Sequence, residues 1–473
     1  MRRESKMSIT IAQITTEQMD KIRLLDEGQF ADIKAKEIAP RTLTQHISAF
    51  ANADGGDLYI GITDKERRWE GFKNVEGANG HLQIFEELFP LGTDFQYDFL
   101  RCANQSGLVL HVQINKTKGI IKASDGFPYI RRGAQTRIIN TPEKFRLLEL
   151  TKGVASFETD TVNVPKETIV NSKITDEFVR QVIPSATAEP WLRKQVLLRD
   201  DRPTVGGVLL FADEPQAVLP KHCGIKVYRY KTRDVAGFRE VLADDPSTVE
   251  GCLYQQIRDA VKLTQQITET IPRMGFSGFE TIKYPPATLH EIVTNAVLHR
   301  DYSVKDDVHI RIFDDRVEVQ SPGRLPAHVT VKNILDERFA RNGAIVRILN
   351  KFPDPPNKDV GEGLNTAFRE MNNLGLKDPI IKELENAVLV LIRHEPLASP
   401  EITILEYLEA HPTIKNAKAR EITHTRTDFR MKSIFNRMEA SHQIEKVPGT
   451  QTSATAYRKI VKNEDGEDVK PKP

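Results

Sequence analysis

Three polar side chains lie at helical spacing in an otherwise apolar stretch, LHEIVTNAVLHRDY at 289–302. Glu291, Asn295 and His299 follow one another at i, i+4 and i+8, so a helix would align them on one face. Such a polar stripe is usually the solvated side of an amphipathic helix. A carboxylate, an amide and an imidazole on one face could instead contact a bound ligand. The helix alone leaves both interpretations open.

Two glycine-containing segments downstream favour the ligand. Ser321-Pro322-Gly323-Arg324-Leu325 follows a pair of predicted strands and forms a turn that can bring backbone close to a ligand. Val360-Gly361-Glu362-Gly363-Leu364 opens another predicted helix. Glycines before a helix N-terminus expose unpaired N–H groups, which suit phosphate oxygens. The pattern therefore indicates a phosphate-bearing ligand.

A second candidate site lies near the N-terminus, in DEGQFADIKAK at 26–36. If FADIKA is a strand, Asp32 and Lys34 point to the same face. Glu27 lies just before it, and Asp64 ends the predicted strand DLYIGITD. Carboxylates in this arrangement could hold a divalent cation beside a scissile phosphate, with Lys34 steadying the developing charge. Exposed strands also commonly carry alternating charges, so this alternative stays open.

Basic residues gather beside aromatic ones in segments suited to phosphate contact and base stacking. The two N-terminal segments are RRW at 67–69 and YIRRGAQTR at 129–137, with Arg67, Arg68, Trp69, Tyr129, Arg131 and Arg132 as candidate nucleic-acid contacts.

A third basic segment, 415–437, holds seven basic and two acidic residues. A predicted helix at 427–438 would bury Phe429, Ile434, Phe435 and Met438 and leave Arg426, Arg430, Lys432 and Arg437 outward. Clustered basic residues on one helix are typical of binding to duplex DNA. The alternative is a protein–protein or self-association surface.

The elements that must position these residues alternate between helix and strand. A helix is predicted at 41–53, strands at DLYIGITD, HVQINKT and PYIRRG, and strands again at TVGGVLLFADEP and HCGIKVYRYKT. A long helix, GCLYQQIRDAVKLTQQITETI, precedes the opening motif, and two strands around an Asp-Asp turn follow it at 308–323. Residues 402–461 have helix–helix–strand–strand spacing. The fold class is therefore α+β, with several domains.

We divide the chain at its polar, proline-containing stretches. The predicted parts are a flexible leader at 1–18, an α/β domain at 19–147, a linker at 148–167, a middle block with a second α/β domain at 168–396 (core 286–396), a small domain at 400–462 and a disordered tail at 463–473.

Composition excludes several classes of protein. Lys and Arg number 67 against 66 Asp and Glu, so nucleic-acid affinity must come from local patches. Three distant cysteines exclude a disulfide framework and fit a reducing compartment. No apolar run approaches the roughly 18 residues that span a membrane, and MRRESKMSIT lacks the apolar part of a signal peptide, so we expect a cytoplasmic protein without membrane contact. No G-x-x-x-x-G-K-[ST] motif occurs, so a P-loop helicase is excluded.

The carboxylate and amide of 289–302, the glycine turn and the glycine-opened helix resemble the Bergerat-fold ATP site of GHKL proteins. The resemblance is closest to a divergent GHKL-like module of bacterial proteins labelled helicase-like, or RecG-like, in which EIVTNAVLHRDY, DDRVEVQSPGRLP, RNGAI and GEGL recur in this order. It implies that Glu291 is the general base for ATP hydrolysis and that Asn295 binds Mg²⁺. It also implies that ATP lies beneath a lid at 325–360, against Ser321, Gly323, Gly361 and Gly363. Ser321 stands where the family pattern has an Asp that binds the adenine amino group.

EGQFADIK, AFANADGGDLYIGITD and YIRRGAQTR resemble the Schlafen AlbA_2 domain, and 402–461 resembles a winged helix. Some Schlafen proteins cleave RNA with three acids from these segments, which map to Glu27, Asp32 and Asp64 and imply Mg²⁺ or Mn²⁺. The second acid is Asp here, where the family pattern has Glu. Other members use this fold only to bind nucleic acid.

Taken together, these resemblances predict a nucleotide-switched protein that binds DNA or RNA. A transcriptional regulator that forms a homo-oligomer is the leading interpretation. The alternative is a metal-dependent nuclease that senses ATP and serves antiviral defence. A scaffold with a vestigial ATP site is the third.

Overall fold

The computed structural model describes residues 10–220, 223–234, 237–275, 278–337, 339–356, 363–395, 400–423, 425, 427–448 and 455–460. The chain forms two compact units. One comprises Met1–Ala367 with Ile380–Leu391, and the other Phe368–Pro379 with Ile392–Pro473. Helices and mixed sheets occur throughout, which confirms the α+β, multidomain prediction. In the part of the chain that the structure describes, no helix has the length and apolar character needed to cross a membrane.

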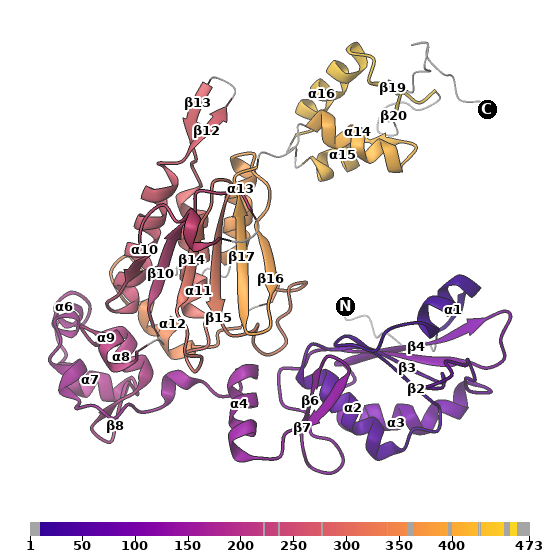
Figure 1. The fold of residues 1–473 in the computed structure, drawn as a ribbon, viewed down its shortest axis with the longest axis horizontal. Helices are drawn as coiled ribbons and strands as arrows, with labels where there is room; N and C mark the ends of the chain where they lie inside the picture. The colour runs from indigo at the N-terminus through magenta and orange to yellow at the C-terminus, as the bar shows by residue number, and fades with distance from the viewer. Residues whose placement is uncertain are drawn as a thin grey trace. The chain divides into compact units, whose positions relative to one another are not determined.

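The N-terminal part of the first unit is a five-stranded sheet in the order β1-β4-β5-β3-β2. Helices α2 and α3 cover one face of this sheet, and α1 covers the other (Figure 1). The bounds are β1 (Ile11–Ile14), α1 (Thr16–Arg23), β2 (Ala31–Lys34), α2 (Pro40–Asn52), β3 (Gly56–Ile60), η1 (Val75–Ala78), α3 (Asn79–Leu88), β4 (Phe95–Cys102) and β5 (Val109–Ile114). Strand β1 pairs with β4 in parallel, so 11–14 belong to the sheet and not to the leader predicted at 1–18.

Helix α2 is the crossover between the parallel strands β2 and β3. A proline opens it, and Leu43, Ile47 and Phe50 repeat at helical spacing on its buried face. Gly55 follows with a φ of 73°, a left-handed conformation that glycine adopts without strain. A Cβ at Gly55 would lie 2.5 Å from the carbonyl oxygen of Ile114, so this turn also needs glycine for close packing on β5. The predicted helix and strand on either side are confirmed.

A hairpin of β6 (Tyr129–Arg132) and β7 (Gln135–Ile138) packs on α2. Helix α4 (Pro142–Lys152) and the short η2 (Phe157–Thr159) follow, where a polar linker was predicted. The ionisable side chains of Lys152 and Glu158 are buried here. Glu158 accepts hydrogen bonds from the backbone N–H groups of Ala344 and Ile345, at 3.0 and 2.8 Å, and so caps a helix nearly 190 residues away.

A six-stranded sheet in the order β11-β10-β14-β15-β17-β16 forms the second half of the first unit. Helices α10 (Leu253–Thr268) and α11 (Pro286–Leu298) pack on it, as Figure 1 shows. Its strands are β10 (Ile225–Arg229), β11 (Ser247–Val249), β14 (Val308–Ile312), β15 (Arg316–Pro322), β16 (Ile380–Glu383) and β17 (Ala387–Arg393). Because β10 pairs with β14, the middle block supplies strands to a domain whose core was predicted to begin at 286.

Helices and two small hairpins complete this part. They are α5 (Glu167–Val170), α6 (Lys173–Val182), α7 (Ala188–Lys194), β8 (Leu198–Arg199), β9 (Arg202–Pro203), α8 (Val205–Phe211), α9 (Pro215–Val218), η3 (Arg239–Val241), β12 (Pro272–Gly275), β13 (Gly278–Thr281), α12 (Gly343–Leu349) and α13 (Gly363–Asn373). The prediction of a strand at TVGGVLLF was wrong, because α8 occupies it. Every residue of α8 is buried, and a short, continuously apolar run carries no periodicity that separates strand from helix.

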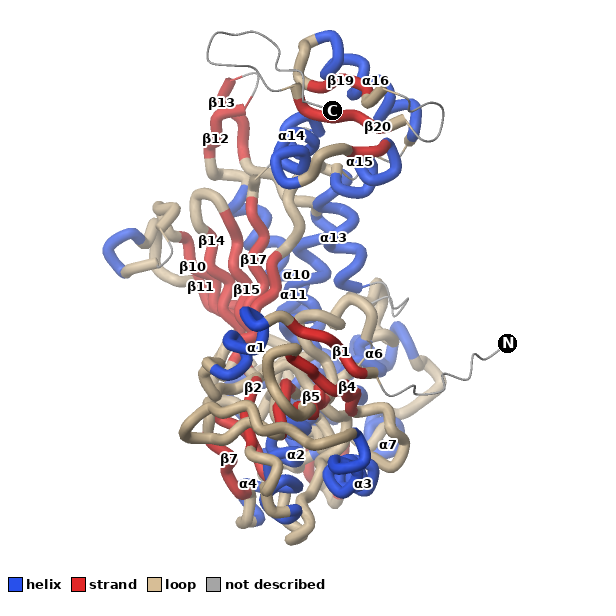
Figure 2. Tube along the Cα trace, turned by 90° about the vertical axis from the view of Figure 1, so that its right-hand side faces the viewer, coloured by secondary structure: helices blue, strands red, loops and turns tan. Residues whose placement is uncertain are grey.

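The second unit holds the C-terminal elements, which Figure 2 shows as helices around a small sheet. They are α14 (Pro400–Ala410), β18 (Ile414–Lys415), α15 (Asn416–Ile422), α16 (Asp428–Ala440), β19 (Ile444–Lys446) and β20 (Ala456–Lys459), with sheet order β18-β20-β19. Ile434, Phe435 and Met438 are buried as predicted. Phe429 is not: its exposed fraction is 84%, and Met431 fills the core instead. The tail predicted at 463–473 lies outside the described residues.

Candidate functional site

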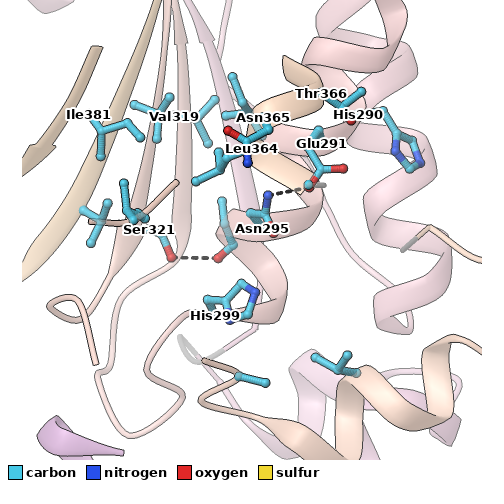
Figure 3. Close-up of a pocket in the computed structure, with 18 of the residues that line it drawn as sticks. His290, Glu291, Asn295, His299, Val319, Ser321, Leu364, Asn365, Thr366 and Ile381 are labelled. Carbon is cyan, nitrogen blue, oxygen red and sulfur yellow. Dashed lines mark hydrogen bonds between the residues drawn. The ribbon is translucent and has the colours of Figure 1, made fainter. Parts of the chain in front are cut away.

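A cavity of about 890 Å³ lies between α11 and the second sheet. Glu291, Asn295 and His299 line it from the helix, and Figure 3 shows them along one side. The sheet contributes an apolar surface opposite, made of Val319, Ile381, Val388 and Val390. Other residues of α11, Leu289, Val293 and Val297, are buried and do not line the cavity. The polar stripe of 289–302 therefore faces a cavity and is not simply the solvated side of a helix.

Glu291 and Asn295 interact directly, since Asn295 Nδ2 donates a 2.7 Å hydrogen bond to Glu291 Oε1. Burial raises the pKa of Glu291, and the hydrogen bond from Asn295 opposes that rise. Because the amide nitrogen is turned to the carboxylate, Asn295 Oδ1 is the atom left to accept from, or coordinate, a ligand. The pair thus presents a carboxylate and an amide oxygen to one cavity.

Helix α13 begins at Gly363, beside this pair. A Cβ at Gly363 would lie 2.5 Å from Glu291 Oε1, so a larger residue here would displace the carboxylate from the helix start. The first N–H groups of a helix have no partner within the helix and attract anions. Gly361, the other predicted phosphate-lining glycine, lies outside the described residues.

Ser321 occupies the β15 side of the cavity, and its hydroxyl donates a 2.6 Å hydrogen bond to the carbonyl oxygen of Ala296. The proton of Ser321 is therefore committed to α11, and its oxygen can act toward a ligand only as an acceptor. Gly323, two residues on, has a φ of 95°, and a Cβ there would lie 2.4 Å from the Cβ of Asp301. The turn after β15 therefore depends on glycine to pack against the segment that follows α11.

His299 lies one turn beyond Asn295, toward the end of the cavity where Figure 3 shows Ser321. Burial, and then the charge of Arg341, lower the pKa of His299 to about 4. The imidazole is therefore neutral near pH 7 and offers one donor and one acceptor.

Two arginines of the segments that flank the cavity, Arg341 and Arg300, have partners within the protein. Arg341 is buried and donates to Asp301 Oδ2 at 2.8 Å and to the carbonyl oxygen of Leu150 at 2.9 Å. Arg300 is also buried, donates to the carbonyl oxygen of Asp306 and stacks on Tyr302. Neither guanidinium is among the residues that line the cavity.

The predicted nuclease site has a different character from the nucleotide cavity. Asp32 is buried and surrounded by nitrogen-bearing side chains: Lys34 Nζ lies 2.5 Å away, Arg131 Nη1 2.7 Å and His46 Nδ1 3.2 Å. Burial raises the pKa of Asp32, but hydrogen bonds from His46 and Lys34 and the positive charges of Lys34 and Arg131 outweigh it, so the pKa is well below its usual range. This carboxylate is ionised and neutralised by protein groups, which leaves it poorly placed to bind a metal.

The other two acids do not complete a metal site. Glu27 pairs with Arg67, whose Nη1 lies 3.2 Å from Glu27 Oε1, and Asp64 is exposed. Across the described ranges, no three His, Cys, Asp or Glu side chains come together in a group able to hold a metal ion. The structure therefore does not bring Glu27, Asp32 and Asp64 into the arrangement that metal-dependent cleavage requires.

Half of the N-terminal basic and aromatic candidates are buried. Trp69 packs in the core between α1 and the sheet, and Tyr129 is buried with its hydroxyl donating to Asp125 Oδ2. Arg131 donates to Asp32 and to the carbonyl oxygens of Gly28 and Ala31, and its guanidinium lies over the Phe50 ring. These three were predicted wrongly as nucleic-acid contacts, because their polar groups are satisfied inside the domain.

The remaining candidates stand at the surface to different degrees. Arg132 is exposed at the end of β6, and Arg68 is exposed but pairs with Glu66 at 2.7 Å. On α16, Arg430 is exposed, whereas Lys432 pairs with Asp428 and Arg437 with Glu401, both at 2.7 Å. Exposed ion pairs of this kind are weak and exchange readily for phosphate partners. Arg426 lies outside the described residues.

The sequence analysis missed the apolar wall of the cavity. Val319 and Ser321 are two apart on β15, and Val388 and Val390 are two apart on β17, so each pair shares one face of its strand. That alternation was visible in the sequence as VEVQS and AVLVLI. Because these strands lie far from 289–302 along the chain, the sequence does not indicate that they face the same cavity.

Comparison with known proteins supports both predicted domains. Residues 27–140 match the family model described as Schlafen, AlbA_2, and 305–392 match the one described as putative ATP-dependent DNA helicase recG C-terminal. Among solved structures, the chain is similar to the DIP2311 protein from Corynebacterium diphtheriae, at 18% sequence identity and a TM-score of 0.41 over 93% of this chain and 96% of that one. No curated protein gives a significant match. The chain thus matches a Schlafen AlbA_2 model and a recG C-terminal model in the order that the sequence resemblance predicted, and the winged helix predicted at 400–462 stays a prediction.

Proposed function

We propose that this protein binds ATP in the cavity between α11 and the second sheet, and that the nucleotide controls how the protein binds nucleic acid. The observation that carries the proposal is the facing of Glu291 and Asn295 into one cavity beside the glycine that opens α13. A volume of about 890 Å³ is within the range of small-molecule sites. The family model for 305–392 is also described by ATP dependence.

Each part of ATP has a chemically suitable counterpart. The apolar wall of Val319, Val388 and Val390 suits the face of a nucleobase. Ser321 Oγ, whose proton is already used, can accept a hydrogen bond from the adenine amino group, as the missing Asp would have done. Phosphate oxygens fit the helix start at Gly363. Ser321 can therefore replace the Asp as the hydrogen-bond acceptor for the adenine amino group, but its uncharged hydroxyl is a weaker acceptor.

Mg²⁺ fits the remaining groups. Asn295 Oδ1 would hold it, because amide oxygens are hard ligands that Mg²⁺ accepts alongside water and phosphate. When bound with ATP, the ion would neutralise phosphate charge. Glu291 would act as the general base: its raised pKa brings the carboxylate nearer to neutral pH, where proton abstraction from water is more favourable.

For nucleic-acid binding we infer two surfaces. The AlbA_2 domain presents Arg132 at the β6–β7 turn. The C-terminal elements, three helices with a small antiparallel sheet, support the winged-helix interpretation and present Arg430 beside the exposed Phe429. A cation next to an aromatic ring suits a phosphate and an adjacent base. A transcriptional regulator, acting as a homo-oligomer, is the role we favour; the neutralised Asp32 weighs against the nuclease.

The proposal is tested by the thermal midpoint of the full chain with and without ATP and Mg²⁺. ATP binding to the folded protein alone raises the midpoint in a concentration-dependent way. Asn295→Ala should abolish the Mg²⁺-dependent part of the rise, whereas Asn140→Ala, an exposed asparagine far from the cavity in sequence, should keep it. No rise for the wild type, or an equal rise for Asn295→Ala, would contradict the proposal.

A further inference from the structure

The wall of the cavity just after Ser321 is fastened to a different domain. Arg324, Leu325, Pro326 and Val329 line the cavity, and the last three belong to the stretch 325–360 that was predicted to cover the nucleotide. We call 324–329 the wall segment. Within the described residues, several of its polar contacts are made with the AlbA_2 domain and α4, which belong to the same compact unit.

The principal contact is an ion pair between the domains. Arg324 Nη2 donates to Asp54 Oδ1 at 2.7 Å, and Arg324 Nε lies 3.1 Å from Glu383 Oε1 on β16. Asp54 is the residue that follows α2 in the AlbA_2 motif AFANADGG, and its side chain is only 7% exposed. The Arg324 guanidinium is therefore the cationic partner of a buried carboxylate.

Three further hydrogen bonds from earlier parts of the chain hold the backbone of the wall segment. Lys116 Nζ donates to the carbonyl oxygens of Leu325 and Val329, at 2.8 and 3.2 Å. The N–H of Ala327 donates to the carbonyl oxygen of Lys152 on α4, at 2.9 Å. The wall segment is therefore held partly by groups that lie more than 170 residues earlier in the chain. Its own domain holds the rest: Glu383 Oε1 accepts from the N–H of Leu325 at 3.0 Å, and Arg341 Nη2 donates to the carbonyl oxygen of Arg324.

Asp54 is itself held in place inside the AlbA_2 domain. Gln29 Nε2 donates to Asp54 Oδ2 at 2.6 Å, so both carboxylate oxygens have a partner. Gln29 in turn accepts a hydrogen bond from the N–H of Gly133, in the β6–β7 turn beside Arg132. The carboxylate therefore has one orientation, and that orientation is directed at Arg324.

We propose that Asp54 is a positioning residue for the nucleotide site: its ion pair with Arg324 fixes the wall segment in the conformation that closes the cavity around ATP. The inference rests on the proposed function, since the ligand is ATP with Mg²⁺. Asp54 touches no ligand and acts only through Arg324. Loss of its charge leaves Arg324 with Glu383 alone and releases the wall segment toward β16.

The test is the dissociation constant for Mg²⁺-ATP, measured on the full chain well below its thermal midpoint. Asp54→Asn keeps the shape of the side chain and should weaken binding about tenfold, within the range of coupling between linked sites. The same substitution in an Arg324→Gln background should add nothing, because the pair is already broken. Asp57→Asn is the matched control: Asp57 lies three residues away in the same domain but bonds to His111.

The outcomes separate positioning from a general effect on folding. A structural role would lower the midpoint of Asp54→Asn without ATP yet leave the dissociation constant unchanged, and that result overturns the proposal. Additive losses in the double variant would also overturn it. If the wild type binds no ATP, the proposed function fails and this inference with it; if the wild type binds and Asp54→Asn binds equally, only this inference fails.

Discussion

Asn295 donates its hydrogen bond to Glu291 across one turn of α11, 2.7 Å from nitrogen to oxygen, inside a cavity that an apolar sheet closes. This relationship orients two groups at once. The amide oxygen of Asn295 is turned away from Glu291, and the carboxylate of Glu291 is held against the start of α13. A polar helix face that only contacts solvent would not need two side chains held in fixed orientations.

Glu291→Gln separates ATP binding from ATP hydrolysis. The amide keeps the size of the side chain but cannot accept a proton, so we expect binding within a few-fold of wild type and a hydrolysis rate lower by about 10²–10⁴-fold, the usual contribution of a general base. Phosphate release and equilibrium binding measure the two quantities. Glu86→Gln, on the exposed side of α3, is the control and should leave both unchanged. Hydrolysis by Glu291→Gln at the wild-type rate would exclude Glu291 as the base.

The hydrolysis rate should depend on pH through the same carboxylate. Burial raises the pKa of Glu291 above its ordinary range, so the base is lost by protonation as pH falls through that raised value. We expect the rate to rise with pH and to level off above the pKa, with a midpoint higher than about 4.3, the value of a free Glu. A rate profile on the full chain over the range where it stays folded measures the midpoint. A midpoint at or below the free value would contradict the burial of this group.

Asp32→Ala should destabilise the AlbA_2 domain. The substitution leaves the buried Arg131 without a counter-charge and Lys34 with only Glu27, 4.0 Å away, and breaking a buried ion pair in this way costs about 3–5 kcal/mol. Urea unfolding measures the loss, and Glu66→Ala, which removes only an exposed partner of Arg68, should cost well under about 1 kcal/mol. An unchanged free energy of unfolding would mean that the ion pairs of Asp32 with Arg131 and Lys34 contribute nothing to stability.

Acid should lower the stability of the wild type by protonating Asp32 in the same ion pairs. The folded pKa of Asp32 is lower than its unfolded value, so the carboxylate contributes stability above about pH 4 that is lost as pH falls toward the folded pKa. Asp32→Asn lacks the titrating group and should lose less stability over that range. Unfolding free energies compared at neutral and acidic pH decide the matter, and parallel curves for the two proteins would contradict it.

Lys152 predicts a further gain of stability with pH, in the alkaline range. Burial, and then the charge of Lys116, lower the pKa of Lys152 to about 7, so folding favours the neutral amine. The unfolded chain keeps the proton up to about pH 10. The wild type should therefore gain stability as pH rises from about 7 to about 10, and Lys152→Met should lose that gain. Equal pH dependence in the two proteins would show that Lys152 remains charged when folded.

Nucleic-acid binding through α16 should depend on Arg430 and Phe429. Arg430→Ala should weaken binding and reduce the slope of affinity against salt by about one counterion. Phe429→Ala removes a ring whose exposed fraction is 84%, so it should weaken binding to single strands by about 1–3 kcal/mol with little cost in stability. Ser433→Ala, exposed on the same helix, is the control for fluorescence titrations. Wild-type affinity in both variants would remove α16 from the interface.

The sequence predicts those parts of the site that depend on residues close together along the chain. The alignment of Glu291 with Asn295 follows from helical spacing within one segment and was predictable. Whether the stripe faces solvent or a cavity depends on Val388 and Val390, nearly 100 residues away, which no local pattern reveals.

Contacts between residues far apart along the chain also explain why the roles predicted for Asp32, Tyr129 and Arg131 differ from their surroundings in the AlbA_2 domain. Spacing placed Asp32 and Lys34 on one face, and the structure pairs them. Arg131, which neutralises Asp32, comes from a strand 99 residues later, and it turned a predicted metal ligand into half of a buried ion pair. Arg131 and Tyr129 were predicted as surface contacts because strand alternation does not say which face a later hairpin will cover.

The most direct test of the central claim is the dissociation constant of ATP, measured with Mg²⁺ by equilibrium titration of the wild type, Asn295→Ala and Asn140→Ala. We predict saturable binding at one site per chain for the wild type and Asn140→Ala, and at least tenfold weaker binding for Asn295→Ala. Mg²⁺ removal should weaken the wild type but not Asn295→Ala. Equal affinity in all three proteins, or no binding by the wild type, would contradict the assignment of the α11 cavity as an ATP site.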